Sequence, residues 1–263
     1  MKVYLQGIGL WGAGLYGWEA SLPILRGEAP LDPQSRPVPP SDLLAAAERR
    51  RAPATVRLAL RVAQDACTQS QAQASELASV FASSQGDTEI TDYMCRELAL
   101  PGAAISPTKF HNSVHNAASG YWTIATGCTR PSNAISGGSA SFACALLEAA
   151  SLCVADQQSS LLCAYDIAAP ELMVTVCPVT SGFGVALVLS PTRTLQSFAE
   201  LNLSLNTQGR EAELPETLQI LWAANPIARA LPLLVTLARR QSSAIDFTLT
   251  ERQSLRVEVV SWK

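Results

Sequence analysis

Two short stretches are apolar at nearly every position, which limits the folds that this chain can adopt. Residues 160–165 read SLLCAY, and residues 183–189 read FGVALVL. A strand that faces water on one side alternates apolar and polar residues, whereas a strand covered on both faces reads as a continuous apolar run. The two stretches therefore predict strands of a sheet that is covered by helices on both faces.

The rest of the chain predicts further strands and helices in alternation. Strands are expected at 2–8, 76–83, 133–136 and 196–205, with a terminal hairpin at 244–262. Helices are expected at 18–26, 41–73 with a break at Pro53, 89–98, 106–126, 140–154 and 227–240. Residues 27–41 hold five prolines and predict an extended surface segment. This order favours an α/β fold with a mainly parallel sheet, and no linker divides residues 1–263 into separate domains.

The composition is that of a globular protein with a large core. Of the 263 residues 48% are apolar and 16% are charged, and the net charge is −3. The cluster Arg49-Arg50-Arg51 is too short for a nucleic-acid surface, and we interpret it as a solvated helix end. We therefore expect no nucleic-acid partner.

The cysteines and the uncharged segments indicate the compartment. Seven cysteines, an odd number without a C-x-x-C pair, predict free buried thiols in a reducing cytosol. The longest uncharged span, 172–192, contains Pro178 and two glycines, which favours strands and a turn over a membrane helix. Glycines also interrupt the apolar N-terminus, unlike a secretory signal. The sequence predicts a soluble cytoplasmic protein without membrane insertion.

Gly7, Gly9 and Gly12 form a G-x-G-x-x-G pattern directly after an expected strand. Such glycines can admit the pyrophosphate of a dinucleotide to a helix N-terminus. That site also needs a second strand ending in an acidic residue about 20 positions later, where this chain has its proline-rich segment. Close packing of a strand-to-helix turn explains the glycines as well, and we favour that interpretation.

The only two histidines, His111 and His115, are four residues apart and would share one face of a helix. This spacing can hold a metal ion, but no glutamate follows His111 and no third ligand has a convincing spacing. We interpret the pair as polar residues of a helix near an interface, and we expect no metal site.

Ser139 lies in the turn SGGSAS, residues 136–141, between a short strand and a long apolar helix. A nucleophile on such a turn is exposed, and the following helix N-terminus could stabilise an anion. A serine nucleophile also needs a general base, and no histidine follows position 139. A small residue at a tight strand–helix junction is the favoured interpretation.

The residues around this turn resemble the β-ketoacyl-ACP synthases, or ketosynthases. The register runs without a gap from Ser106 to Ala145, through the proline-led helix and the Gly120-Tyr121-Trp122-Thr123-Ile124 step. It places Ser139 at the position of the nucleophilic cysteine. Residues 181–189 are similar to a glycine-rich ketosynthase strand, and residues 3–14 to the opening strand and turn. The resemblance thus replaces the dinucleotide interpretation of the glycines.

This resemblance implies a thiolase-like (ketosynthase) α/β fold. It covers residues 1–190 well, which would form a complete N-terminal half, and is weak over 191–263, which would form an abbreviated C-terminal half. The departures imply that catalysis is lost. Ser139 replaces the cysteine, both family histidines that promote decarboxylation are missing, and the loop between residues 165 and 183 is short.

A degenerate ketosynthase of this kind resembles a chain-length factor of type II polyketide systems, in particular the small subunits found with aryl polyene synthases. Chain-length factors pair with a full-length ketosynthase that carries the catalytic cysteine, and an acyl carrier protein serves the complex. The implied role is to close the acyl tunnel at the heterodimer interface and to limit the length of the product. The resemblance implies no cofactor.

By register, Lys109, Phe110 and Ser113 fall where ketosynthases line the neighbouring subunit's tunnel, and Tyr93 and Met94 are further candidates from the preceding helix. Two alternatives stay open. One is an acyl-transferring or hydrolytic enzyme that uses Ser139, and the other is a free-standing acyl-binding homodimer.

Overall fold

The computed structural model describes residues 1–34, 36–207, 209 and 214–262. Residue 35, in the expected extended segment 27–41, lies outside them. Their strands form one mixed sheet in the order β4-β3-β5-β6-β1-β7-β9-β8, with β2 paired to β1. The strands are β1 (Lys2–Gly12), β2 (Leu15–Tyr16), β3 (Ala78–Ala82), β4 (Ser132–Ile135), β5 (Ser160–Asp166), β6 (Phe183–Ser190), β7 (Ala199–Asn206), β8 (Ser243–Thr250) and β9 (Gln253–Ser261).

The prediction of a mainly parallel sheet is wrong. Only β3 pairs in parallel, with β4 on one side and β5 on the other, and the remaining described pairs are antiparallel. A parallel return requires a crossover, usually a helix. The chain between β5 and β6 contains no helix, so β6 returns antiparallel, and β8 and β9 form the expected hairpin.

The helices follow the expected pattern with three differences. They are α1 (Trp18–Arg26), α2 (Ala46–Arg51), α3 (Ala54–Ser70), α4 (Thr88–Leu98), α5 (Pro107–Asn112), α6 (Ala117–Thr126), α7 (Ser141–Asp156), α8 (Glu216–Ala224) and α9 (Leu231–Ala238), with short 3₁₀ turns η1 (Ala74–Glu76), η2 (Gly138–Ala140) and η3 (Pro226–Ala230). The break before α3 lies at Pro53, as predicted.

The differences have local causes. The helix expected over 106–126 is interrupted at 113–116, where serine, histidine and asparagine favour turns over helix. The helix expected over 227–240 begins as the 3₁₀ turn η3, and α9 ends at Ala238. Helix α8 was missed, although the spacing of its buried Leu218 and Leu221 is helical.

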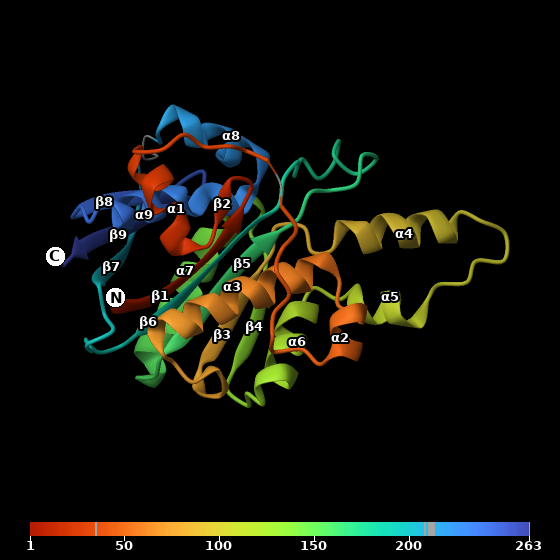
Figure 1. Ribbon diagram of the computed structural model, residues 1–263, viewed down its shortest axis with the longest axis horizontal. Coiled ribbons are helices and arrows are strands. Elements are labelled where there is room, and N and C mark those ends of the chain that lie inside the picture. The colour runs from red at the N-terminus through yellow and green to blue at the C-terminus, as the bar shows by residue number, and fades with distance from the viewer. Residues whose placement is uncertain (35, 208, 210–213, 263) are drawn as a thin grey trace.

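Two separate cores lie on the two faces of the central strands. Along β5, Leu161, Cys163 and Tyr165 face a core that contains α3 and α6, whereas Leu162 and Ala164 face a core that contains α7 and α9. Successive side chains of a strand point to opposite faces, so an apolar residue is needed at every position. The double covering that the apolar runs predicted is confirmed, and Figure 1 shows the helices on either side of the sheet.

The C-terminal strands extend the sheet but are covered on one face only. Inward residues of β7 and β9, such as Leu201 and Val257, join the core of α7 and α9. Described residues beyond 190 contribute nothing to the α3 core. Polar residues alternate with the apolar ones, as at Glu200 and Asn202, which is the pattern of a sheet face in contact with water.

One segment, Gly138–Asp156, has the length and apolar composition of a membrane-spanning helix. It comprises η2 and α7, and α7 packs on β3 and β5 with Phe142, Leu146 and Cys153 in the core. All seven cysteines are free, as predicted. Burial raises the pKa of the Cys153 thiol to about 11 and that of Cys67 to about 12.

The glycine pattern of the N-terminus lies inside strand β1. A Cβ at Gly7 would overlap the carbonyl oxygen of Ala66, and a Cβ at Gly9 would overlap that of Val62. Both carbonyls belong to α3, which crosses β1 at close range. Close packing is therefore confirmed, but the expected strand-to-helix turn is wrong, because the glycines lie within a strand. Gly7 and Gly9 are required because the backbone of α3 lies where side chains would be.

We predict that Gly9→Ala destabilises the fold by at least about 3 kcal/mol, because neither the strand nor the helix backbone can yield to the added methyl group. The control is Gly120→Ala in α6, where the new Cβ meets nothing within 4 Å. Alanine there should stabilise by about 0.5–1 kcal/mol through helix propensity. Urea unfolding followed by circular dichroism measures both changes, and equal effects would disprove the close approach.

Candidate functional site

Ser139 lies in the 3₁₀ turn η2 at the entrance to α7. Gly138 before it has φ +57°, in the left-handed region that favours glycine. The turn is held by Ser141, whose Oγ accepts from Gly137 N–H at 3.0 Å and donates to Gly138 O at 2.7 Å. The Ser139 side chain is left exposed at the tip of a fixed turn.

A small cavity of about 90 Å³ adjoins Ser139. Its lining includes Ala143 from α7, Trp222 from α8 and Phe247 from β8, and the Arg229 guanidinium stacks 4.0 Å from the centre of the Trp222 ring. Neither histidine lines this cavity. Its one carboxylate, Asp246, lies 3.5 Å from Arg256. The described lining thus provides a hydroxyl without an imidazole partner, and acyl transfer to a serine requires such a base.

A buried carboxylate fixes the loop that follows β3. Asp166, at the end of β5, is 2% exposed. It accepts hydrogen bonds from Ser83 Oγ at 2.6 Å, from Ser84 N–H at 3.0 Å and from Ser84 Oγ. The pKa of the Asp166 carboxyl lies above its ordinary value, because burial raises it by more than the hydrogen bonds from Ser83 and Ser84 lower it. The network joins the carboxyl ends of two adjacent parallel strands.

The same loop anchors the elements on either side of it. His115 Nε2 lies 3.2 Å from Ser83 O, and Ser136 Oγ donates to Ser84 O at 3.1 Å. The expectation that His111 and His115 share one helical face is wrong, because His115 lies in the turn after α5 and contacts this loop instead. Asp166 therefore holds both the Ser139 turn and the start of α6 in place.

Helices α4 and α5 pack together as a hairpin that projects from the sheet (Figure 1). Two of the predicted residues meet there: Lys109 Nζ lies 3.6 Å from the centre of the Tyr93 ring, and Tyr93 Oη accepts from Ser106 N–H at 3.2 Å. These contacts fix the start of α5 against α4.

The other predicted residues are spread along this hairpin. The side chain of Phe110 is 62% exposed. Ser113 is exposed at the end of α5, where its Oγ donates to Phe110 O at 2.8 Å, and Met94 is half-buried on α4. That these residues face an acyl tunnel stays a prediction.

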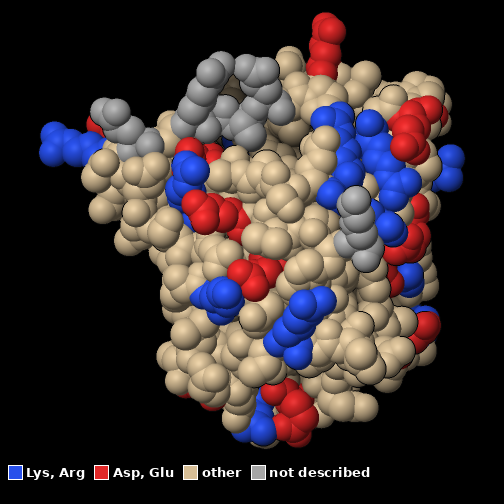
Figure 2. Space-filling view, turned by 90° about the vertical axis from the view of Figure 1, so that its left-hand side faces the viewer, with Lys and Arg blue, Asp and Glu red and all other residues tan. Residues whose placement is uncertain are grey.

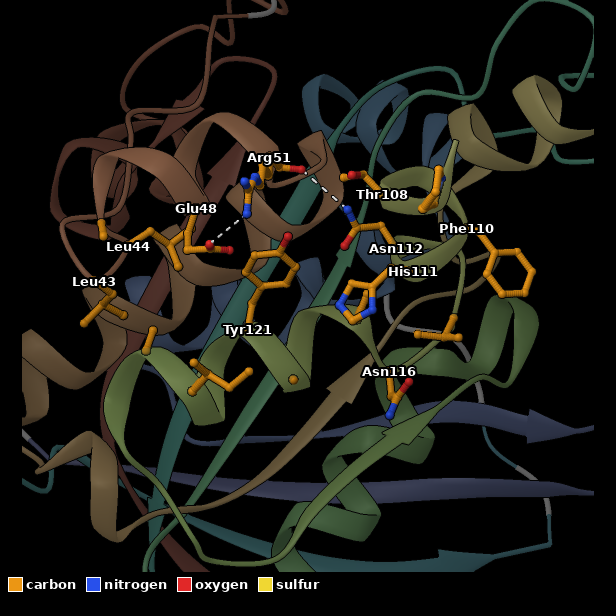
Figure 3. A pocket seen from close by; sticks show the side chains of 17 residues that line it. Leu43, Leu44, Glu48, Arg51, Thr108, Phe110, His111, Asn112, Asn116 and Tyr121 are labelled. Carbon is orange, nitrogen blue, oxygen red and sulfur yellow. Dashed lines mark hydrogen bonds and ion pairs between the residues drawn. The ribbon is translucent and has the colours of Figure 1, made fainter. Parts of the chain in front are cut away.

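A groove of about 870 Å³ runs between the segment before α3 and the helices α5 and α6. We call it the α5–α6 groove. Its apolar lining includes Leu43, Leu44, Pro107, Phe110, Val114, Tyr121 and Ile124, and its polar lining includes Glu48, Arg51, Thr108, His111, Asn112 and Asn116. Figure 3 shows Leu43 and Phe110 on opposite sides of it, with Tyr121 between them.

The polar residues gather at one part of this groove (Figure 3). Arg51 forms an ion pair with Glu48 at 3.5 Å, and its carbonyl oxygen accepts from Asn112 Nδ2 at 3.5 Å. Asn112 is 3% exposed, and its Oδ1 has no hydrogen-bond partner among the described residues. A buried acceptor without a donor is costly, so this atom marks a place where an added donor would be stabilising.

Reasoning from the sequence missed the second wall of this groove. Arg51 was interpreted as part of a solvated helix end, whereas its side chain and that of Glu48 line the groove. Leu43 and Leu44 come from the turn region before α2. Only the fold brings this region, more than 60 positions away, against α5 and α6, and two adjacent leucines outside a helix were the only available signal.

Residues 26–252 match the family model described as the N-terminal domain of β-ketoacyl synthases. The chain belongs to this family. The resemblance noted at residues 106–145 is thereby confirmed, and it extends across most of the chain. No curated protein matches the chain in sequence.

Solved ketosynthase structures share the fold at low sequence identity. One is described as the ketosynthase ApeO in complex with its chain length factor ApeC from Xenorhabdus doucetiae, with 21% identity, a TM-score of 0.74, and coverage of 98% of this chain and 99% of that chain. The ishigamide ketosynthase/chain length factor has 11% identity, a TM-score of 0.75 and full coverage of both chains. The AntDE:AntF complex, a ketosynthase with an acyl-carrier protein, has 10% identity, a TM-score of 0.79 and 99% coverage of both.

These similarities establish the thiolase-like fold with an abbreviated C-terminal half. In the described chain that half consists of β7, β8, β9, α8 and α9 on one continuous sheet. A helical layer comparable to α3 is absent from its second face over the described residues.

Replacing Asp166 by alanine should destabilise the fold by about 3 kcal/mol or more, because three buried donors of Ser83 and Ser84 would lose their acceptor. Asp156→Ala, at an exposed carboxylate that ends α7, is the matched control and should change stability by less than about 0.5 kcal/mol. Chemical unfolding measures both free energies of unfolding. An Asp166→Ala variant as stable as the unmodified chain would contradict the anchoring role.

Proposed function

We propose that this chain is a non-catalytic chain-length-factor subunit, which pairs with a full-length ketosynthase that carries the catalytic cysteine. The observation that carries the proposal is an apolar surface that no other part of the described chain covers. It consists of the α5–α6 groove together with the adjoining edge strand β4, and we call it the pairing surface.

The helical part of the pairing surface is apolar and exposed. Ile124 is 84% exposed, Phe110 62% and Val114 52%, and all three line the groove. Isolated exposed apolar residues are common on protein surfaces, but a contiguous group that lines one large groove is typical of an interaction site. Burying these side chains against a partner would supply the hydrophobic driving force for association.

The edge strand supplies the second part. β4 hydrogen-bonds to β3 on one side only, and all four of its residues are half-buried. A sheet edge presents unpaired N–H and C=O groups that can pair with a strand of another chain. Helix α6 packs beside β4, so one partner could cover both at once.

The environment of Ser139 supports a non-catalytic role. The serine occupies the nucleophile position by register, and the described lining of its cavity has no histidine. A hydroxyl without a general base is a poor acyl acceptor at neutral pH. The partner ketosynthase would therefore carry out the acyl transfer, and this chain would form part of the wall of the acyl tunnel.

We further propose that the α4–α5 hairpin shapes the acyl tunnel of the complex. Tyr93 and Lys109 brace the hairpin, while Phe110 and Ser113 present exposed side chains near its end. Met94, half-buried on α4, belongs to the same hairpin. A wall of fixed side chains resists each added carbon unit and so limits the length of the product.

The likeness to ketosynthase/chain-length-factor complexes supports this role, and the family membership supports a part in acyl-chain synthesis. An acyl carrier protein is the expected second partner, as in one of the similar complexes. We assign the complex to type II polyketide biosynthesis of the aryl polyene kind, in the cytoplasm, where seven free thiols would stay reduced.

Co-expression with the ketosynthase of the same gene cluster should give a stable 1:1 complex. Ile124→Glu should weaken it at least about tenfold, because the new carboxylate would be buried without a partner. Leu195→Glu is the matched control: Leu195 is fully exposed in the turn before β7, outside the pairing surface, and the complex should persist.

Size-exclusion chromatography with light scattering, followed by titration calorimetry, measures both variants. A chain that stays monomeric beside the ketosynthase would refute the proposed pairing. A homodimer that excludes the ketosynthase would support the acyl-binding homodimer instead.

In the reconstituted complex with carrier protein, Ser113→Phe should shorten the product by at least one two-carbon unit, because the larger ring would fill part of the tunnel. Ser139→Ala should leave both the amount and the length of the product unchanged. Mass spectrometry of the carrier-bound acyl chains measures both.

The two variants separate the competing functions. Loss of all product in Ser139→Ala would establish a catalytic serine and overturn the non-catalytic role. An unchanged product length in Ser113→Phe would remove that residue from the tunnel.

A further inference from the structure

Two helices that are far apart in the sequence end side by side, away from the pairing surface. α1 ends at Arg26 and α9 ends at Ala238. The Arg26 side chain joins the two ends, since its Nε donates to Ala238 O at 2.8 Å. A hollow of about 690 Å³ lies between them.

Three arginines give this hollow an excess of positive charge. Arg26, Arg239 and Arg240 line it, and the one acidic residue in the described lining is Glu28, whose carboxylate lies 4.0 Å from Arg26. Over the described part of the chain, Arg239 and Arg240 form no ion pair. Figure 2 looks onto this side of the molecule and shows Lys and Arg side chains gathered in its upper right part.

The last carbonyl groups of α9 need no hydrogen bond from the side chains of Arg239 and Arg240. Backbone N–H groups of Arg239, Arg240 and Gln241 already satisfy the carbonyls of residues 235–237, and Arg26 satisfies that of Ala238. Basic residues at a helix C-terminus are favourable because of the helix dipole. Among the described residues, no side-chain hydrogen bond or ion pair engages the Arg239 and Arg240 guanidinium groups.

The backbone at Arg240 is left-handed, as it is at Gln71 and Gln157, which end α3 and α7. The φ of Arg240 is 52°, in the left-handed region where a helix end ordinarily has glycine or asparagine. A side chain with a Cβ is strained in this conformation.

We propose that the hollow between α1 and α9 binds a phosphate-class oxyanion, either inorganic phosphate or the phosphate of a small ester. Guanidinium groups match two oxygens of such an anion at once. The Arg26 side chain is held in position by Ala238 O, and Arg239 and Arg240 approach from the adjacent helix end. The amide group of Gln241, in the same lining, adds a neutral donor.

The test is a titration of inorganic phosphate into the full chain by calorimetry, at constant ionic strength set with chloride. Arg240→Gly should weaken phosphate binding about tenfold, through the loss of a charge-assisted contact. Without phosphate the same variant should have a Tm about 2–4 °C higher, because glycine relieves the left-handed strain. If Arg240 had only a structural role, the variant would not combine weaker phosphate binding with a higher Tm.

Two further variants serve as controls. Gln71→Gly, at the left-handed C-cap of α3 with φ 59°, should raise the Tm similarly and leave phosphate binding unchanged. Arg239→Gln, at a right-handed helical position, should weaken phosphate binding without raising the Tm.

A parallel titration with glycerol 1-phosphate identifies the source of the anion. Tighter binding of this ester assigns the hollow to phosphate esters, and tighter binding of inorganic phosphate assigns it to the free anion. The proposal is overturned if phosphate gives no more heat than added chloride, or if all the variants bind phosphate equally.

Discussion

The close contact between strand β1 and helix α3 is the constraint on which the rest of the fold depends. β1 pairs with β6 on one side and with β7 on the other, so it joins the N-terminal strands to the C-terminal extension. Gly7 and Gly9 let the α3 backbone lie directly on it. Any larger residue would push the helix away and open the core that β5, β6 and α6 share with α3.

From this framework the polar residues at the strand ends determine where the functional elements lie. Asp166 ties the loop after β3 to the end of β5, and this loop in turn contacts His115 and Ser136. The Ser139 turn and the start of α6 are thus placed by one buried carboxylate.

The two halves of the chain differ in how much structure surrounds the sheet. The strands before residue 190 are covered on both faces, whereas β7, β8 and β9 have helices on one face and alternating polar residues on the other. An abbreviated half of this kind can retain a stable sheet because the polar residues on its second face are compatible with contact with water. A large groove with an apolar lining lies instead between α5 and α6, on the N-terminal half, whereas the C-terminal half exposes single apolar residues such as Leu205 and Ile220.

The sequence by itself determined the double-sided covering of β5 and β6, the break at Pro53 and the family. These follow from local patterns: apolar periodicity, proline, and a continuous motif register. Only the tertiary structure decided the antiparallel return of β6, the contact of His115 with Ser83, and the groove wall formed by Leu43 and Arg51. These features depend on contacts between segments that are distant in the sequence. Local sequence patterns do not determine which distant segments come into contact.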